Sequence, residues 1–319
     1  MKLVVTGALG HIGSRFIHGL EPGDYDEVVL LDNLSTQRYC SLFNLPPGVP
    51  FRFVRDDVCT ANLERHFEGM DVVVHLAAIT NAAGSFEIQR DVERVNFEGT
   101  ERVARACTRT GSRLVFVSTT SVYGSQSDVV DEDCPIEDLK PQSPYAHSKL
   151  RAEQMLQALA RSGGLRCFIG RFGTIFGTSI GMRFHTAVNK FCWQACVGQP
   201  LTVWRTALNQ KRPYLDVGDA VRALDLVIRR DLFDNRVYNV LTENATVGQI
   251  VEIIRSLVPD VVVEEVDSRI MNQLSYDVSS ARFEQAGFRA QGRLADGIER
   301  TIRQMAGVRQ VAGTGSPAC

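Results

Sequence analysis

A tyrosine and a lysine stand four residues apart in the segment SPYAHSKL, residues 143–150. On a helix, Tyr145 and Lys149 would share one face, with their Cβ atoms about 5–6 Å apart. A free tyrosine ionises near pH ~10, and a neighbouring positive charge lowers that pKa. The pair therefore has the composition of a general base. Taken alone, the short Y-x-x-x-K pattern favours an exposed tyrosine beside a solvated lysine, so the rest of the chain has to supply a site.

Three glycines form a second motif that could bind a ligand. VVTGALGHIGSRF contains Gly7, Gly10 and Gly13, directly after a predicted strand and at the start of a predicted helix. Glycine permits a tight turn and lets a pyrophosphate approach the backbone, and the helix N-terminus offers free N–H groups. The next predicted strand ends at Asp32, whose carboxylate can accept hydrogen bonds from both ribose hydroxyls and repels a 2′-phosphate. The motif predicts NAD rather than NADP.

The elements that would position these residues follow a regular alternation. Continuous apolar runs predict strands that are buried on both faces of a parallel sheet. Segments with helical spacing of apolar residues separate them. This order predicts an α/β fold, a Rossmann-type doubly wound parallel sheet with a smaller C-terminal substrate-binding lobe. The predicted strands are 2–7, 27–32, 51–57, 71–77, 113–119 and 166–172, and the helices between them include 12–20, 91–110 and 148–162.

The regular alternation loosens after about residue 175. We expect an NAD-binding Rossmann domain over residues 1–175, to which later segments return, and a mainly substrate-binding lobe over 176–305. Residues 306–319 end in small and polar side chains, which predicts a disordered tail.

Composition excludes several classes of protein. The 319 residues carry a formal net charge of −2, which does not favour nucleic acid or an anionic membrane as a partner. No apolar run approaches the roughly 20 residues needed to span a bilayer. The eight cysteines are scattered without a C-x-x-C pair, so they match neither a metal site nor a disulfide framework. We interpret them as reduced thiols of a cytoplasmic protein without a bound metal.

Taken together, the motifs resemble the extended short-chain dehydrogenase/reductase family, especially its nucleotide-sugar epimerase and dehydratase branch. TGALGHIG, LLDNLST, RDDVC, HLAA, VSTTSVYG, PYAHSK and QKRPYLDV occur in the family's order, and the resemblance covers nearly all of residues 1–305. It implies an NAD-dependent enzyme that acts on a nucleotide sugar.

The resemblance also assigns roles to residues. It implies that Thr119, Tyr145 and Lys149 are catalytic, with Tyr145 as the base and Lys149 also holding the nicotinamide ribose. Besides Tyr145 and Lys149, the cofactor contacts that it implies are Gly7, Gly10, His11, Ile12, Gly13, Asp32, Asn33, Asp57, Val58, Leu76, Ala77, Ala78 and Asn96. The substrate contacts are Ser85, Thr119, Thr120, Thr174, Asn189 and Arg212. For Asn189, a helix cap is the alternative.

Two departures from the family pattern bear on the reaction. Thr174 stands where the family usually has a substrate-binding asparagine. Thr120 and Ser121 stand where 4,6-dehydratases carry an Asp-Glu pair. The sequence therefore predicts epimerisation at carbon 4 of the sugar through a transient 4-keto intermediate. The alternatives are a nucleotide-sugar dehydrogenase or ketoreductase, a dehydratase, or an inactive NAD-binding regulatory protein.

The helices after DVERVN and SPYAHSK carry apolar residues on more than one face, which is typical of a helix with a second partner. In the resembling family these two helices pair across a twofold axis. The sequence therefore predicts a homodimer. The apolar residues concerned are Val92, Val95, Val103 and Cys107 on one helix and Leu150, Met155, Leu156 and Leu159 on the other.

Overall fold

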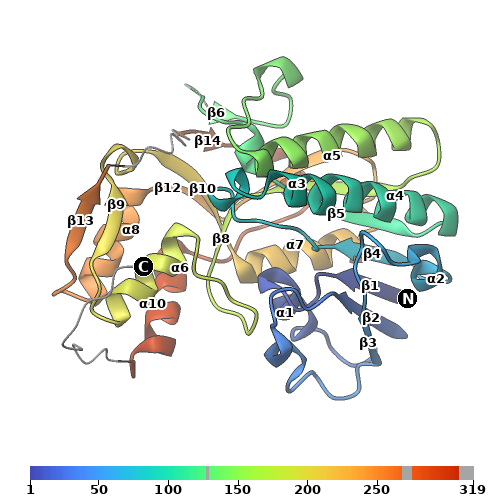
Figure 1. Cartoon of the computed structure of the whole chain (residues 1–319), viewed down its shortest axis with the longest axis horizontal. Helices are drawn as coiled ribbons and strands as arrows, with labels where there is room; N and C mark the ends of the chain where they lie inside the picture. Colours follow the sequence, from blue (N-terminus) through green and yellow to red (C-terminus); the bar gives the residue numbers. More distant parts are fainter. Residues whose placement is uncertain (127–128, 268–274, 309–319) are drawn as a thin grey trace.

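The computed structural model describes residues 1–126, 129–267 and 275–308. Its centre is a seven-stranded sheet in which every strand pair is parallel (Figure 1). The strand order is β11-β7-β5-β4-β1-β2-β3. The strands are β1 (Lys2–Thr6), β2 (Glu27–Asp32), β3 (Phe51–Arg55), β4 (Val72–His75), β5 (Arg113–Thr119), β7 (Cys167–Phe172) and β11 (Val237–Val240).

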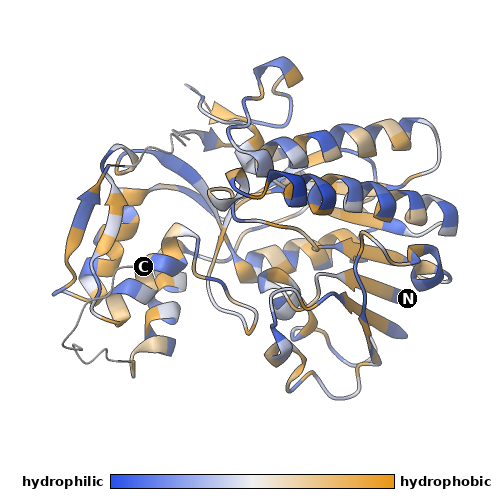
Figure 2. Ribbon diagram, in the orientation of Figure 1, coloured by the Kyte–Doolittle hydropathy of each residue, from blue (hydrophilic) through white to orange (hydrophobic). Residues whose placement is uncertain are grey.

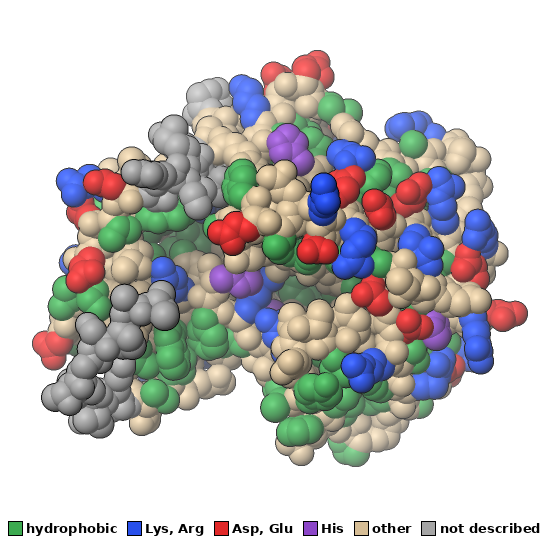
Figure 3. Space-filling model, viewed as in Figure 1, with side chains coloured by type: hydrophobic (Ala, Val, Ile, Leu, Met, Phe, Trp, Pro, Cys, Tyr) green, Lys and Arg blue, Asp and Glu red, His purple; other side chains and the backbone are tan. Residues whose placement is uncertain are grey.

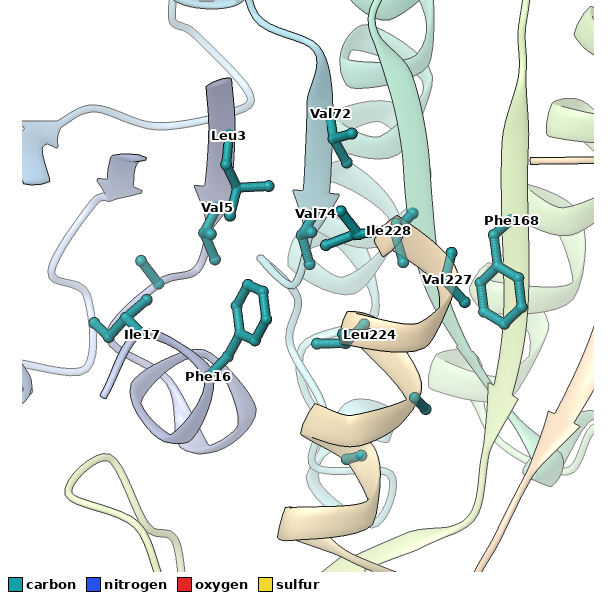
Figure 4. Packing of buried hydrophobic residues seen from close by; sticks show 14 of the residues in the cluster. Leu3, Val5, Phe16, Ile17, Val72, Val74, Phe168, Leu224, Val227 and Ile228 are labelled. Atoms are coloured by element: carbon teal, nitrogen blue, oxygen red, sulfur yellow. The ribbon is translucent and has the colours of Figure 1, made fainter. Parts of the chain in front are cut away.

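One face of this sheet is covered by α1 (His11–Ile17) and α7 (Val217–Arg229). Phe16 of α1 and Leu224 of α7 point toward the sheet, where they meet side chains such as Val5 and Val74 (Figure 4). The helix α9 (Ala281–Gln285) adds Phe283 to the same core. Burial of this apolar surface stabilises the fold by about 25 cal/mol per Å².

The opposite face is covered by α2 (Leu63–Phe67), α4 (Gly99–Thr110) and α5 (Pro144–Arg161). A short helix α3 (Gln89–Val92) runs into α4 through a π turn over Glu93–Glu98. Because helices cover both faces, most strands are buried throughout, and the predicted doubly wound fold is confirmed. The edge strand β3 is the exception: it pairs only with β2 and is largely exposed, so its predicted burial is wrong.

A smaller lobe lies beside the carboxyl ends of the sheet (Figure 1). It has its own apolar core, and its inner faces are apolar while its outer faces are mostly polar (Figure 2). Its elements are β8 (Thr174–Phe176), β10 (Lys211–Asp216), β12 (Glu243–Thr246), β9 (Leu201–Trp204), β13 (Val263–Val266), α6 (Ala187–Cys196), α8 (Val247–Leu257) and α10 (Leu294–Met305). A two-stranded pair, β6 (Val129–Val130) with β14 (Asp277–Val278), completes the strands.

Chain order and spatial order differ after β8. The helix α7 and the strand β11 lie on and in the large sheet, although they follow residue 175. Of the expected tail, residues 306–308 follow α10 directly, and 309–319 lie outside the described residues. Within the described ranges, no helix has the length and apolarity needed to cross a bilayer.

Candidate active site

The glycine-rich turn lies where the strand order of the sheet reverses, between β1 and β4, the usual place for a ligand in such a sheet. Gly7 has φ +65°, and a Cβ there would lie 2.6 Å from the nitrogen of Ala77. A Cβ on Gly13 would lie 2.6 Å from the carbonyl oxygen of Ala8. Both positions therefore require glycine, because the turn packs directly on the end of β4 and on itself.

The third glycine differs from these two. A Cβ on Gly10 would meet only the Gly7 carbonyl oxygen, at 3.2 Å, and Arg38 Nη1, at 4.0 Å. One side of the turn is thus open toward Arg38. Beside it, His11 Nε2 and Arg183 Nε are buried and have no hydrogen-bond partner. An open glycine face beside an unpaired buried guanidinium nitrogen of Arg183 fits the diphosphate of a dinucleotide.

Asp32 ends β2 next to this turn, as predicted from the sequence. Its Oδ2 accepts a hydrogen bond from Leu9 N at 3.1 Å, and its Oδ1 accepts one from Leu34 N at 2.9 Å. These bonds fix the carboxylate at the strand end. Nearby, Asn33 Nδ2 donates to Asp57 Oδ2 at 3.0 Å, and Val58 is buried. The predicted ribose and adenine residues therefore lie together at one edge of the site.

The side chain of Asn96 binds the backbone of the segment that follows β4. Its Nδ2 donates to Ile79 O at 2.8 Å, and its Oδ1 accepts from Ile79 N, also at 2.8 Å. The same Nδ2 donates to Ser148 Oγ at 3.3 Å. The side chain thus fixes the segment that follows Leu76, Ala77 and Ala78, next to the helix that carries Tyr145.

Tyr145 is the second residue of α5, so the start of this helix determines where its side chain lies. Ser143 caps the helix, its Oγ accepting from Ala146 N at 3.2 Å, and Pro144 takes the first helical position. Thr119 is the last residue of β5, and its side chain is close enough to Tyr145 to lower the pKa of that hydroxyl against the larger raising effect of burial. The predicted Thr–Tyr pair is therefore in place, on two rigid elements.

Lys149 lies one turn along α5 but does not point at the Tyr145 hydroxyl. Its Nζ donates to Val117 O at 2.8 Å and lies 4.7 Å from the centre of the Phe116 ring. Burial lowers the pKa of Lys149 to about 7, an effect that the charge of Glu153 partly opposes. In the described chain, the positive charge that acts on Tyr145 comes from Arg183 instead.

Arg183 was missed by the sequence analysis. Burial raises the pKa of Tyr145, and the Arg183 charge and the Thr119 side chain oppose this rise without cancelling it. Burial also lowers the pKa of Arg183 to about 10. No motif marks this arginine, because it belongs to the irregular segment between β8 and α6.

Two predicted substrate residues make backbone contacts. Ser85 Oγ donates to Ala82 O at 2.6 Å and accepts from Tyr145 N at 3.4 Å. Asn189 is fully buried in α6, and its Nδ2 donates to Arg183 O at 3.1 Å. Both side chains thus support residues of the site through the main chain.

Two further predicted substrate residues, Thr120 and Arg212, act on a second tyrosine, Tyr276, that the sequence analysis also missed. The side chains of Thr120 and Ser121 and the charge of Arg212 lower the pKa of Tyr276, against the larger raising effect of burial. Thr174 is half-buried on β8, where it pairs with β10, the strand of Arg212. Sequence offered no signal for Tyr276, which follows Thr120 by more than 150 residues.

Comparison with known proteins agrees with this geometry. The profile of the NAD dependent epimerase/dehydratase family matches residues 3–240. The chain belongs to this family. Its cofactor is NAD, which solved structures of similar proteins contain. Members of the family include both epimerases and dehydratases, so membership alone leaves the reaction open.

Individual relatives show the same division. A dTDP-glucose 4,6-dehydratase of Streptomyces griseus is 33% identical over 94% of this chain and 92% of that protein. A structure of UDP-glucose 4-epimerase from Thermus thermophilus with NAD is 28% identical, with a TM-score of 0.81 over 96% of this chain and 99% of that one. A trifunctional UDP-glucose 4,6-dehydratase/UDP-4-keto-6-deoxy-D-glucose 3,5-epimerase/UDP-4-keto-L-rhamnose-reductase of Arabidopsis thaliana is 29% identical over 94% of this chain. The chain spans about half of that longer protein, 46%.

We expect NAD to bind roughly tenfold or more tightly than NADP, because a 2′-phosphate would meet the Asp32 carboxylate. Parallel calorimetric titrations of cofactor-free protein with the two dinucleotides measure this ratio. Asp32→Asn is the matched variant, since its side-chain oxygen keeps one acceptor while the charge is removed. Equal affinities in the unaltered protein would show that Asp32 does not reach the ribose.

Proposed function

We propose that the protein is an NAD-dependent nucleotide-sugar epimerase that inverts carbon 4 through a transient 4-keto intermediate. The observation that carries the proposal is the surroundings of Tyr145. The Thr119 side chain lowers the pKa of Tyr145, and the next two residues, Thr120 and Ser121, carry hydroxyls that lower the pKa of Tyr276, in both cases against the larger raising effect of burial. Carboxylates that would serve as acid and base at carbons 5 and 6 are absent from these two positions.

The residues support each proton movement of this reaction. Tyr145 is the proposed base for the carbon-4 hydroxyl. The Arg183 charge favours its phenolate against the larger raising effect of burial on the pKa of Tyr145, and Thr119 would hold the same sugar oxygen in place. NAD, held by the glycine-rich turn and Asp32, would supply the hydride acceptor for carbon 4 and then the hydride donor for the opposite face of the keto sugar. Tyr145 then gives its proton back to the new hydroxyl. The cycle needs no further acid or base and leaves no net redox change.

Turnover of a panel of UDP-, dTDP-, GDP- and CDP-sugars in deuterated water tests the reaction, with products identified by NMR. We expect one nucleotide sugar to equilibrate with its carbon-4 epimer without deuterium on carbon, because the original hydride is returned.

Other outcomes favour the alternatives. Deuterium at carbon 3, 5 or 6 would show enolisation, as in a dehydratase or a 3,5-epimerase. NADH that accumulates together with a keto sugar would show a dehydrogenase. Because some relatives are dehydratases, deuterium on carbon is the more informative of these two outcomes. A known dTDP-glucose 4,6-dehydratase serves as the positive reference for it.

A homodimer through α4 and α5 is part of the proposal. These two helices lie side by side on one face of the molecule (Figure 1). Four of the apolar residues expected at the interface are buried in the core of the chain itself: Val92, Val103, Cys107 and Leu156. The other four remain partly accessible: Val95, Leu150, Met155 and Leu159.

We expect the dimer mass, twice the 35.3 kDa of one chain, in sedimentation at micromolar concentration. Leu159→Glu places a charge among the partly accessible residues and should shift the protein toward the monomer. A species of 35.3 kDa alone in the unaltered protein would contradict the proposed dimer.

The cytoplasm is the proposed compartment. The seven cysteines within the described residues are free thiols, and three of them, Cys107, Cys167 and Cys192, are buried. Burial raises the pKa of each of these three thiols, which keeps them in the unreactive protonated form.

A further inference from the structure

The segment Ser179–His185, here called the strap, connects the substrate lobe to the cofactor site. It follows β8 and precedes α6, and it lies against the glycine-rich turn. Ser179 Oγ is hydrogen-bonded to His11 Nδ1 at 2.9 Å, and Gly181 N donates to Ser14 Oγ at 2.9 Å. A Cβ on Gly181 would lie 2.3 Å from Leu9 O, so the two backbones are in direct contact.

Asn189 fixes the strap from the lobe side. Its Oδ1 accepts a hydrogen bond from Gly177 N at 3.2 Å, before the strap, and its Nδ2 donates to Arg183 O at 3.1 Å, within it. Asn189 is fully buried, so both bonds are shielded from water. The position of the Arg183 backbone is therefore set by contacts on both sides.

The strap brings Arg183 into a cluster of basic side chains. Burial lowers the pKa of His11 to about 3, and Arg183, Arg38 and His185 lower it further in that order. Lys, Arg and His side chains also gather in the recess between lobe and sheet (Figure 3).

The acidic partner of this cluster within the described residues is Asp32, whose charge acts on Arg38. Both Asp32 oxygens already accept backbone hydrogen bonds. Arg183 Nε and His11 Nε2 remain buried without partners. A buried cationic group of this kind is costly unless an anion binds to it.

We propose that Arg183 and Arg38 form a two-arginine clamp on the diphosphate of NAD, with the strap carrying Arg183 across from the substrate lobe. The position of Arg38, 4.0 Å from the open side of Gly10, places one arginine over the turn that receives the diphosphate. Arg183, carried by the strap, lies close enough for its charge to act on both His11 and Arg38. Guanidinium groups bind phosphate oxygens in pairs, which gives strong and directional contacts.

The competing occupant for Arg183 is an anionic group of the substrate, since its charge also acts on Tyr145. The cofactor is favoured because the strap is hydrogen-bonded to His11 and Ser14, and because Arg38 and His11 both belong to the cofactor half. The clamp makes the cofactor contact the lobe that binds the substrate. It therefore predicts slow release of NAD during turnover, which a reaction without net redox change requires.

Release of NAD from the purified protein tests the clamp without using turnover. The freed dinucleotide is consumed by an excess of an unrelated NAD-dependent enzyme, and the rate is followed by absorbance. We expect Arg183→Gln and Arg38→Gln each to speed release by roughly tenfold or more, because each removes a charge-assisted contact. Arg183→Lys should fall between Arg183→Gln and the unaltered protein, since it keeps the charge but not the planar fork.

Two comparisons make the result specific to the diphosphate. In calorimetry on cofactor-free protein, Arg183→Gln should weaken ADP-ribose but leave adenosine unchanged. The matched control is Arg205→Gln, an arginine of the same lobe that pairs with Glu265 at 3.5 Å on the surface, and it should leave release unchanged.

Release rates and ADP-ribose affinities within about twofold of the unaltered protein for Arg183→Gln would overturn the clamp. A raised KM for the nucleotide sugar with unchanged NAD release would overturn it in favour of a substrate contact. If Arg183→Gln does not melt cooperatively, Arg183→Lys decides by the same criteria. None of these measurements depends on which carbon of the sugar reacts, so they stand apart from the proposed epimerisation.

Discussion

Replacing Tyr145 by phenylalanine is expected to lower kcat by about 10²- to 10⁴-fold while NAD stays bound. The phenol hydroxyl is the group whose pKa Arg183 and Thr119 lower against the larger raising effect of burial, and it is the proposed base. The ring itself remains in Tyr145→Phe, so α5 should keep its start at Ser143 and Pro144. Most of the proposed cofactor contacts lie on other elements, chiefly the glycine-rich turn and the end of β2.

Turnover and bound NAD are measured on the same preparation, with the nucleotide released by denaturation and quantified by mass. Tyr25→Phe is the matched control, because Tyr25 is a buried tyrosine in the core under α1 and α7, away from the site. It should keep kcat within a few-fold of the unaltered protein. A similarly small change in Tyr145→Phe would show that Tyr145 is not the base.

The fold could be predicted because its signals are local. Apolar runs of strand length, helical spacing between them and glycines at the first turn each act within a few residues. The burial of β3 was wrong because position in the sheet is not local: an apolar run at the edge has a neighbour on one side only. Its two arginines, Arg52 and Arg55, fit this exposed position.

The residues of the site differ in the same way: local motifs predict some of them, and the others depend on the tertiary fold. Thr119, Tyr145 and Asp32 end or begin regular elements, and their places follow from the motifs that surround them. Arg183 and Tyr276 reach the site only through the tertiary fold, the first by the strap and the second from the chain next to β14. Neither has a spacing that could have marked it.

Lys149 shows a further limit of prediction from sequence: helical spacing does not give the hydrogen-bond partner of a side chain. Spacing of four residues on a helix correctly places Lys149 on the same side as Tyr145. It does not say which acceptor the ammonium finds, and here Val117 O on the buried strand β5 is the partner. A motif thus gives the neighbourhood of a side chain, while its hydrogen bond depends on the surface beneath the helix.

Glu153 forms the ion pair that holds this helix to the sheet. It lies four residues after Lys149 on α5 and is buried. Its Oε2 accepts from Arg171 Nη2 at 2.8 Å and Nε at 3.1 Å, and its Oε1 accepts from Ser118 Oγ. Ser118 directly precedes Thr119, and Arg171 belongs to β7. One carboxylate therefore connects the helix of Tyr145 with the strand of Thr119.

Glu153→Leu is expected to reduce the free energy of unfolding by about 3–5 kcal/mol, because it leaves the Arg171 guanidinium buried without its counter-charge. Urea unfolding of cofactor-free protein measures the change. Arg171→Met should cost a similar amount for the converse reason. The double variant Glu153→Leu/Arg171→Met should recover much of the loss, since an apolar pair of similar volume carries no desolvation cost.

Comparison of the two single variants with the double variant distinguishes the contribution of the buried ion pair from that of side-chain packing. Two single losses that add up fully in the double variant would show that the charges do not depend on each other. Arg151→Met, whose guanidinium is exposed on the same helix and pairs with Glu93, is the surface control and should cost no more than about 1 kcal/mol. Because the pair positions α5 against β5, the double variant should regain stability without regaining full turnover: hydrophobic side chains can fill the space but cannot hold Ser118, and with it the neighbouring Thr119, by a hydrogen bond.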